Sequence, residues 1–105
     1  MKEESFVRYL NEPDIHDGVV KDVVHGGGHC SVFVRTAQGR EIKFEFVDVS
    51  SVEMNRPEGM VLYSLSEMKE VPPNRKFVFT NWDEQNDARL EIVALDVISS
   101  DLERT

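Results

Sequence analysis

The chain has 105 residues, the length of one domain, and it is long enough to bury a core without disulfides or metals. Its formal charge of −8 argues against a nucleic-acid ligand, because phosphates are bound by Lys and Arg, and no apolar run is long enough to span a membrane. A single cysteine, Cys30, excludes an intramolecular disulfide, and Met1–Ser5 lack the apolar stretch of a signal peptide. We therefore expect a single domain over residues 1–105, located in the cytoplasm.

The N-terminal segment, residues 1–14, has a short apolar run from Phe6 to Leu10 that fits either a helical turn or a strand. Pro13 ends this run, since a residue before proline is disfavoured in the α region. We expect a turn or short helix here that docks on a sheet.

From Val19 onward, runs of Val and Phe punctuated by glycines predict strands. The best-specified element is a hairpin around Gly39, in which residues 37–39 form a three-residue loop and Gly39 takes a left-handed conformation. The residue numbers of paired positions then sum to 76. The inward pairs would be Val34–Ile42, Val32–Phe44 and Cys30–Phe46, and the outward pairs would be Arg35–Glu41, Phe33–Lys43 and Ser31–Glu45.

The preceding strand, residues 19–25, reaches this hairpin through three glycines. If the residue numbers of paired positions sum to 54, Val20 lies opposite Val34 and Val24 lies opposite Cys30. It also places Asp22 opposite Val32, a mismatch that points to a bulge or an edge strand.

The apolar residues between positions 60 and 68 fit both the period of a strand and the period of a helix. In a strand, one face would carry Val61, Tyr63 and Leu65. In a helix, one face would carry Val61, Leu62, Leu65 and Met68. We favour the strand, which Pro72 and Pro73 end.

The last hairpin joins residues 77–79 to residues 90–92 across a polar loop at 83–86. Its register sets Phe79 opposite Leu90 and Phe77 opposite Ile92. We expect the final strand to run on to about Ser99 and residues 101–105 to fray.

Together these elements predict a mainly β domain, or an α+β domain if a small part is helical. Five to seven antiparallel strands would form a meander that is rolled or packed as a small sandwich or open barrel.

His16 and Asp17 form an adjacent pair of a kind that occurs in metal-dependent phosphohydrolases, but the further ligands of those enzymes are absent. The structural interpretation is that Ile15 packs, Gly18 turns, and His16 or Asp17 caps the start of the next strand.

His25, His29 and Cys30 cluster around the glycine turn. Successive strand residues point to opposite faces, so Cys30 and His29 would not reach one metal, although His25 and His29 could face each other. Cys30 is expected inward beside Phe46 as an inert thiol. We therefore assign no metal ligand, no catalytic residue and no cofactor.

Trp82 is the only tryptophan, and it precedes the acidic loop. It could anchor a partner or cover the open end of the core, and we favour the cover.

Three segments carry a resemblance to known chains: residues 15–20, residues 44–49 and residues 90–94. In this pattern the sequence resembles a group of short bacterial β-rich domains, some of which sit among the immunity proteins of toxin systems. The resemblance implies a fold and supplies no catalytic residue.

The leading hypothesis is a non-enzymatic binding or protein-interaction domain, with an immunity-like role as one form of it. The alternative is a small metal-binding protein or enzyme that uses His16, Asp17, His25 or His29. We expect a protein partner or a homodimer, formed at the open edge of the strand at 19–25, and no membrane or nucleic-acid partner.

Overall fold

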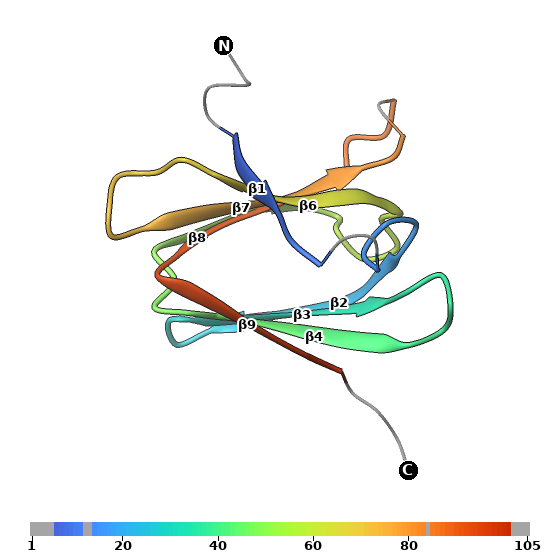
Figure 1. Ribbon diagram of the computed structural model, residues 1–105, viewed down its shortest axis with the longest axis horizontal. Coiled ribbons are helices and arrows are strands. Elements are labelled where there is room, and N and C mark those ends of the chain that lie inside the picture. Colours follow the sequence, from blue (N-terminus) through green and yellow to red (C-terminus); the bar gives the residue numbers. More distant parts are fainter. Residues whose placement is uncertain (1–5, 12–13, 84, 102–105) are drawn as a thin grey trace.

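The computed structural model describes residues 6–11, 14–83 and 85–101. In this part of the chain all regular structure is β, and two antiparallel sheets face each other across one core, as Figure 1 shows edge-on. The five-stranded sheet has the order β1-β6-β7-β8-β5, and the four-stranded sheet has the order β2-β3-β4-β9. The strands are β1 (Phe6–Tyr9), β2 (Val19–Gly26), β3 (His29–Arg35), β4 (Glu41–Val47), β5 (Ser51–Asn55), β6 (Leu62–Met68), β7 (Arg75–Asn81), β8 (Arg89–Ala94) and β9 (Asp96–Asp101).

This arrangement confirms the mainly β prediction, in the form of two packed sheets and not of a closed barrel. Within the described residues there is no helix of the length and apolar character that a membrane crossing requires.

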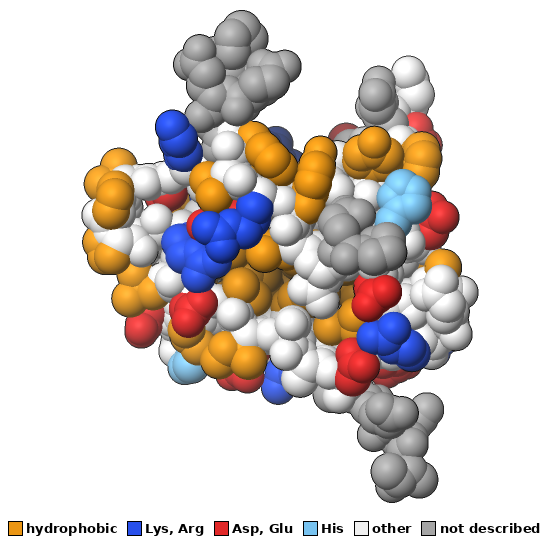
Figure 2. Space-filling model, viewed as in Figure 1, with side chains coloured by type: hydrophobic (Ala, Val, Ile, Leu, Met, Phe, Trp, Pro, Cys, Tyr) orange, Lys and Arg blue, Asp and Glu red, His pale blue; other side chains and the backbone are white. Residues whose placement is uncertain are grey.

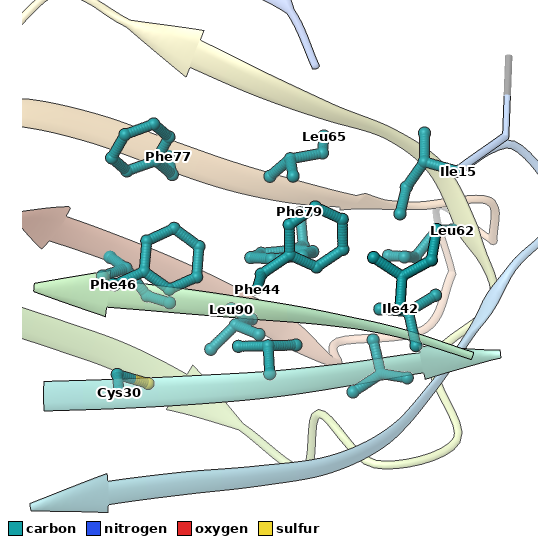
Figure 3. Close-up of a cluster of buried hydrophobic side chains, with 14 of the residues drawn as sticks. Ile15, Cys30, Ile42, Phe44, Phe46, Leu62, Leu65, Phe77, Phe79 and Leu90 are labelled. Atoms are coloured by element: carbon teal, nitrogen blue, oxygen red, sulfur yellow. The ribbon is translucent and has the colours of Figure 1, made fainter. Parts of the chain in front are cut away.

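The core lies between the sheets, where alternate residues of the central strands point inward. Phe44 and Phe46 on β4 meet Phe77 and Phe79 on β7, with ring centroids 5.1 Å apart for Phe46 and Phe77 and 6.0 Å apart for Phe44 and Phe79. Figure 3 shows these rings between the two layers. Tilted and edge-to-face pairs of this kind stabilise a core beyond the area that they bury.

The β3–β4 hairpin confirms the predicted register completely. Gly39 has φ = 91°, and Thr36 N–H donates to Arg40 O at 2.7 Å across the three-residue loop. Val32 lies opposite Phe44 and both are buried, so the predicted apolar face is the inner face of the sheet.

The β2–β3 register is right at its beginning and wrong beyond it. Val20 lies opposite Val34 as predicted, but the register shifts between Val20 and Asp22. The bulge moves every later residue by one place, so Val24 lies opposite Ser31, not Cys30. Val24 therefore points outward and is 56% exposed.

The first half of β2 is not an open edge. Val20 N–H donates to Met60 O at 2.9 Å, and Gly59 N–H donates to Val20 O at 2.7 Å. Leu62 N–H donates to Gly18 O at 2.7 Å. The segment before β6 thus covers the beginning of β2 and ties the two sheets together at this end.

The second half of β2 is a true edge, because β2 ends the four-stranded sheet. Thr36 bonds to Arg40 across the hairpin, so even-numbered residues of β3 direct their backbone groups to β4. Val23 lies opposite Val32, and its N–H therefore points away from β3. This N–H donates a hydrogen bond to the side chain of Asp22, with 2.9 Å between Val23 N and Asp22 Oδ1.

Residues 62–68 form strand β6, as favoured, but the predicted face is wrong. The register shifts between Leu62 and Ser64, so Leu62 and Leu65 are both fully buried. Tyr63, which was predicted inward, is 46% exposed, and Val61 is 41% exposed.

The expected N-terminal turn or helix is instead strand β1, which pairs with β6 at the edge of the five-stranded sheet. Residues 1–5, 12 and 13 of that prediction lie outside the described residues.

The β7–β8 hairpin confirms the pairs Phe79–Leu90 and Phe77–Ile92. The prediction of one continuous final strand is wrong, because the chain turns at Leu95 and leaves the five-stranded sheet. It then runs beside β4 as β9, which Figure 1 shows as the red ribbon passing from the upper to the lower layer. Asp101 belongs to β9, and the rest of the expected frayed end, residues 102–105, lies outside the described residues.

The predicted meander holds within β2-β3-β4 and within β6-β7-β8, and the other strands depart from it. β5 pairs with β8 and β1 pairs with β6, so neighbours in the five-stranded sheet are not always neighbours in the sequence.

Candidate functional site

The turn before β2 carries two of the predicted site residues. Ile15 is fully buried, as expected, and Gly18 N–H donates to Ile15 O at 3.0 Å. The left-handed residue of the turn is Asp17, with φ = 68°, and not Gly18. Asp tolerates this conformation better than most residues, because its short side chain forms local hydrogen bonds. The buried Ile15 therefore anchors the turn, while His16 and Asp17 remain at the surface.

His16 packs against two aromatic side chains, Tyr63 on β6 and Trp82 just after β7. Its ring centroid lies 5.4 Å from that of Tyr63 and 5.3 Å from that of Trp82, and the Tyr63 and Trp82 centroids are 5.0 Å apart. All three pairs are edge-to-face, which is the arrangement that aromatic quadrupoles favour. We name these three residues, His16, Tyr63 and Trp82, the aromatic cluster.

Hydrogen bonds fix the orientation of the aromatic cluster. Trp82 Nε1–H donates to Asp17 Oδ1 at 2.8 Å, across 65 positions of sequence. His16 Nδ1 lies 3.0 Å from Tyr63 O, within hydrogen-bond distance. Trp82 N–H donates to Val61 O at 2.9 Å, which holds the end of β7 beside β6.

The aromatic cluster is a surface feature. Trp82 is 45% exposed and Tyr63 is 46% exposed. The aromatic neighbours of Trp82 are His16 and Tyr63, and the interpretation of Trp82 as a cover of the core stays a prediction. Figure 2 shows hydrophobic, histidine and acidic side chains gathered in this way at the upper right of the molecule.

The loop that follows Trp82 is shaped by local side-chain bonds. Asn81 Oδ1 accepts a hydrogen bond from Asp83 N–H at 3.0 Å, and Asp83 Oδ1 accepts one from Gln85 N–H at 2.9 Å. Such bonds are typical of Asn and Asp in turns. They shape the loop that begins at Asp83, the residue directly after Trp82.

The other predicted candidates lie elsewhere. His25 is opposite Cys30, and His29 is opposite Gly26, so His25 and His29 do not face each other, although the sequence allowed that arrangement. His29 Nδ1 instead lies 3.8 Å from Glu45 Oε2. Over residues 6–11, 14–83 and 85–101, no group of three or more His, Cys, Asp or Glu side chains is placed to hold a metal ion.

Cys30 is buried and lies opposite Phe46, as predicted. Burial raises the pKa of its thiol to about 11, because the charged thiolate is poorly solvated there. The thiol therefore stays protonated at neutral pH and is a poor nucleophile.

The structure thus brings together three of the five sequence candidates, His16, Asp17 and Trp82, and adds Tyr63. Sequence reasoning missed Tyr63 because an unbroken β6 register turned it inward. The only available signal was the ambiguous period of residues 60–68. Comparisons with protein-family models, with curated proteins and with solved structures find no significant match to this chain.

Proposed function

We propose that this protein is a non-enzymatic protein-interaction domain whose partner contacts the aromatic cluster. The observation that carries the proposal is that His16, Tyr63 and Trp82 pack together while Tyr63 and Trp82 each remain close to half exposed. Trp and Tyr dominate the binding energy of protein interfaces, because they bury a large area and lose little conformational freedom.

The hydrogen bonds of the cluster support this function. Asp17 holds the indole of Trp82, and the Tyr63 carbonyl lies within hydrogen-bond distance of the His16 ring. Side chains that are already ordered lose less entropy when a partner binds. The cluster is therefore a preorganised contact surface.

The alternative of a metal-binding protein or enzyme has less support. It would use His16, Asp17, His25 or His29, and only the first two lie in one place. The Nδ1 atom of His16 is also within hydrogen-bond distance of Tyr63 O. An immunity-like role in the bacterial cytoplasm remains a prediction from the sequence.

Affinity capture from native cell extract, with protein identification by mass spectrometry, tests the proposal. The bait is the wild-type chain, Tyr63→Ala, Trp82→Ala, or the control Val71→Ala, which removes a side chain that is 71% exposed at another place. We expect a protein that the wild type and Val71→Ala both retain and that Tyr63→Ala and Trp82→Ala both lose. The same set of captured proteins from all four baits would contradict the proposal.

A further inference from the structure

No Lys or Arg of the described residues neutralises the Asp17 carboxylate, which contacts the aromatic cluster. The Asp17 side chain is 56% exposed, and its contacts are Trp82 Nε1 at 2.8 Å and His16 Nε2 at 4.0 Å. Within the described ranges no Lys or Arg lies within 4.0 Å of the Asp17 or Asp83 carboxylate. The chain's surplus of negative charge is therefore present at the cluster.

Carboxylates on the strands are different, because many of them pair with arginine. Arg35 lies 3.2 Å from Glu41, and Arg40 lies 3.1 Å from Asp101. Every arginine in the part of the chain that the structure describes has such a partner; the remaining pairs are Arg8–Glu67, Arg40–Asp14, Arg56–Asp87, Arg75–Glu67, Arg75–Asp96, Arg89–Glu53 and Arg89–Glu91. A second copy of the chain therefore offers no free arginine from these residues.

The geometry of Trp82 and Asp17 suits a guanidinium group. The Asp17 carboxylate lies at the edge of the indole, and only Oδ1 is engaged by Nε1. A planar cation that stacks on the exposed indole can donate to the other carboxylate oxygen at the same time. Arginine can stack and donate at the same time because its guanidinium group is planar, whereas the lysine ammonium is a strongly hydrated point charge.

We infer that the aromatic cluster binds an arginine side chain in a basic segment of a different protein. The inference rests on the proposed function and specifies its partner. The arginine stacks on Trp82 or Tyr63 and pairs with Asp17, and the overall charge of −8 steers the basic segment toward this surface.

Fluorescence of Trp82, the only tryptophan, reports binding directly. The probes are short peptides without aromatic residues, in which glycine alternates with arginine, lysine or glutamate. We expect saturable changes in emission with the arginine peptide, weaker binding of the lysine peptide and none of the glutamate peptide. Affinity for the arginine peptide should fall as salt rises.

Asp17→Asn tests the carboxylate. Asparagine tolerates positive φ, and its amide oxygen can still accept the indole N–H, so the substitution removes little except the charge. The matched control is Asp48→Asn, since Asp48 is also exposed and has φ = 53°. We expect Asp17→Asn to weaken binding of the arginine peptide about tenfold, a loss of about 1.4 kcal/mol. Asp48→Asn should change the affinity less than about twofold, because charge alone acts weakly over distance. Near-ultraviolet circular dichroism checks that the indole remains packed in both variants.

Equal binding of the arginine and glutamate peptides, or equal affinities of Asp17→Asn and Asp48→Asn, would overturn the inference. The proposed function would survive that result if capture of a protein still depended on Trp82. Loss of Trp82-dependent capture would instead remove the proposed function, whatever the peptides show.

Discussion

Arg75 donates hydrogen bonds from Nε and Nη2 to the two carboxylate oxygens of Glu67, each at 2.9 Å. Its third nitrogen, Nη1, donates to Asp96 Oδ1 at 2.8 Å. Glu67 and Arg75 belong to the five-stranded sheet and Asp96 begins β9, so Arg75 joins the two sheets. Glu67 is only 6% exposed, so this bidentate ion pair is shielded from water.

The Glu67–Arg75 pair should make the stability of the fold depend on acidic pH. The hydrogen bonds from Arg75 hold the pKa of Glu67 below its ordinary value, although burial opposes this effect. A carboxyl group with a lowered pKa in the folded state contributes stability above its unfolded pKa, about 4.3, and that contribution is lost as pH falls through the folded pKa. Urea titrations between about pH 3 and pH 7 should show this loss in the wild type.

Glu67→Gln should flatten that pH dependence and lower the free energy of unfolding at pH 7 by about 1.5–3 kcal/mol, because hydrogen bonds to a charged group are lost. Glu70→Gln, at an exposed position, is the control. Identical pH profiles for the two variants would contradict the assigned role of Glu67.

Phe44→Ala should lower the free energy of unfolding by about 3–5 kcal/mol, because Phe44 is 1% exposed and its removal leaves a cavity beside Phe79. Lys43→Ala should change it by less than about 0.5 kcal/mol, since Lys43 points outward. Chemical denaturation measures both. Equal midpoints would show that the β4 register is wrong.

Gly18→Ala should destabilise the fold by about 1–3 kcal/mol, the usual range for overpacking. An added Cβ would lie 3.0 Å from both Ile15 O and Val34 Cγ1. Gly26→Ala is the control, because a Cβ there meets nothing within 4 Å and the residue does not have positive φ. Thermal melting compares the variants, and an unchanged melting temperature for Gly18→Ala would refute the close packing of this turn.

Asp22→Ala should increase self-association through β2. The Asp22 carboxylate competes for the outward N–H of Val23, and its removal leaves a free donor at a valine-rich edge. Asp22→Asn keeps a hydrogen-bond acceptor, so its self-association should stay near that of the wild type. This variant separates the effect of the hydrogen bond from the effect of the charge. Light scattering over a concentration series gives the oligomeric state, and equal behaviour of the three proteins would exclude the competition.

The registers that could be predicted belong to hairpins with short loops. A three-residue loop that ends in glycine leaves one register for β3 and β4, and alternation of apolar residues then assigns the faces. The β7–β8 pairing followed from apolar residues at alternate positions in the same way.

Most errors come from backbone irregularities. In β2 the mismatch of Asp22 with Val32 indicated a bulge or an edge strand, and the structure shows both. The shift in β6 left no such signal, because a bulge adds one residue without a change in composition. Residues 92–95 are all apolar, so they show no alternation that could reveal that the chain changes sheets at Leu95. β1 has four residues, which is too short for either period to be recognised.

The candidate site was predicted as separate residues and not as a site. His16, Asp17 and Trp82 each stood out by residue type, but Asp17 and Trp82 are brought together only by the packing of a turn beside the end of β7. Such a contact depends on the complete tertiary structure. No spacing along the chain indicates it.

The interleaved strand order also determines when the fold can form during synthesis. The four-stranded sheet lacks its β9 edge until residues 96–101 have been made, and β5 has no partner in its sheet until β8 exists. No N-terminal fragment that ends before β8 can complete either sheet, so a nascent chain exposes unpaired strand edges until β8 and β9 have left the ribosome. Pairings between strands so distant in sequence form slowly. Folding of this domain is therefore expected to wait for β8 and β9, and truncation before these strands should yield aggregating fragments.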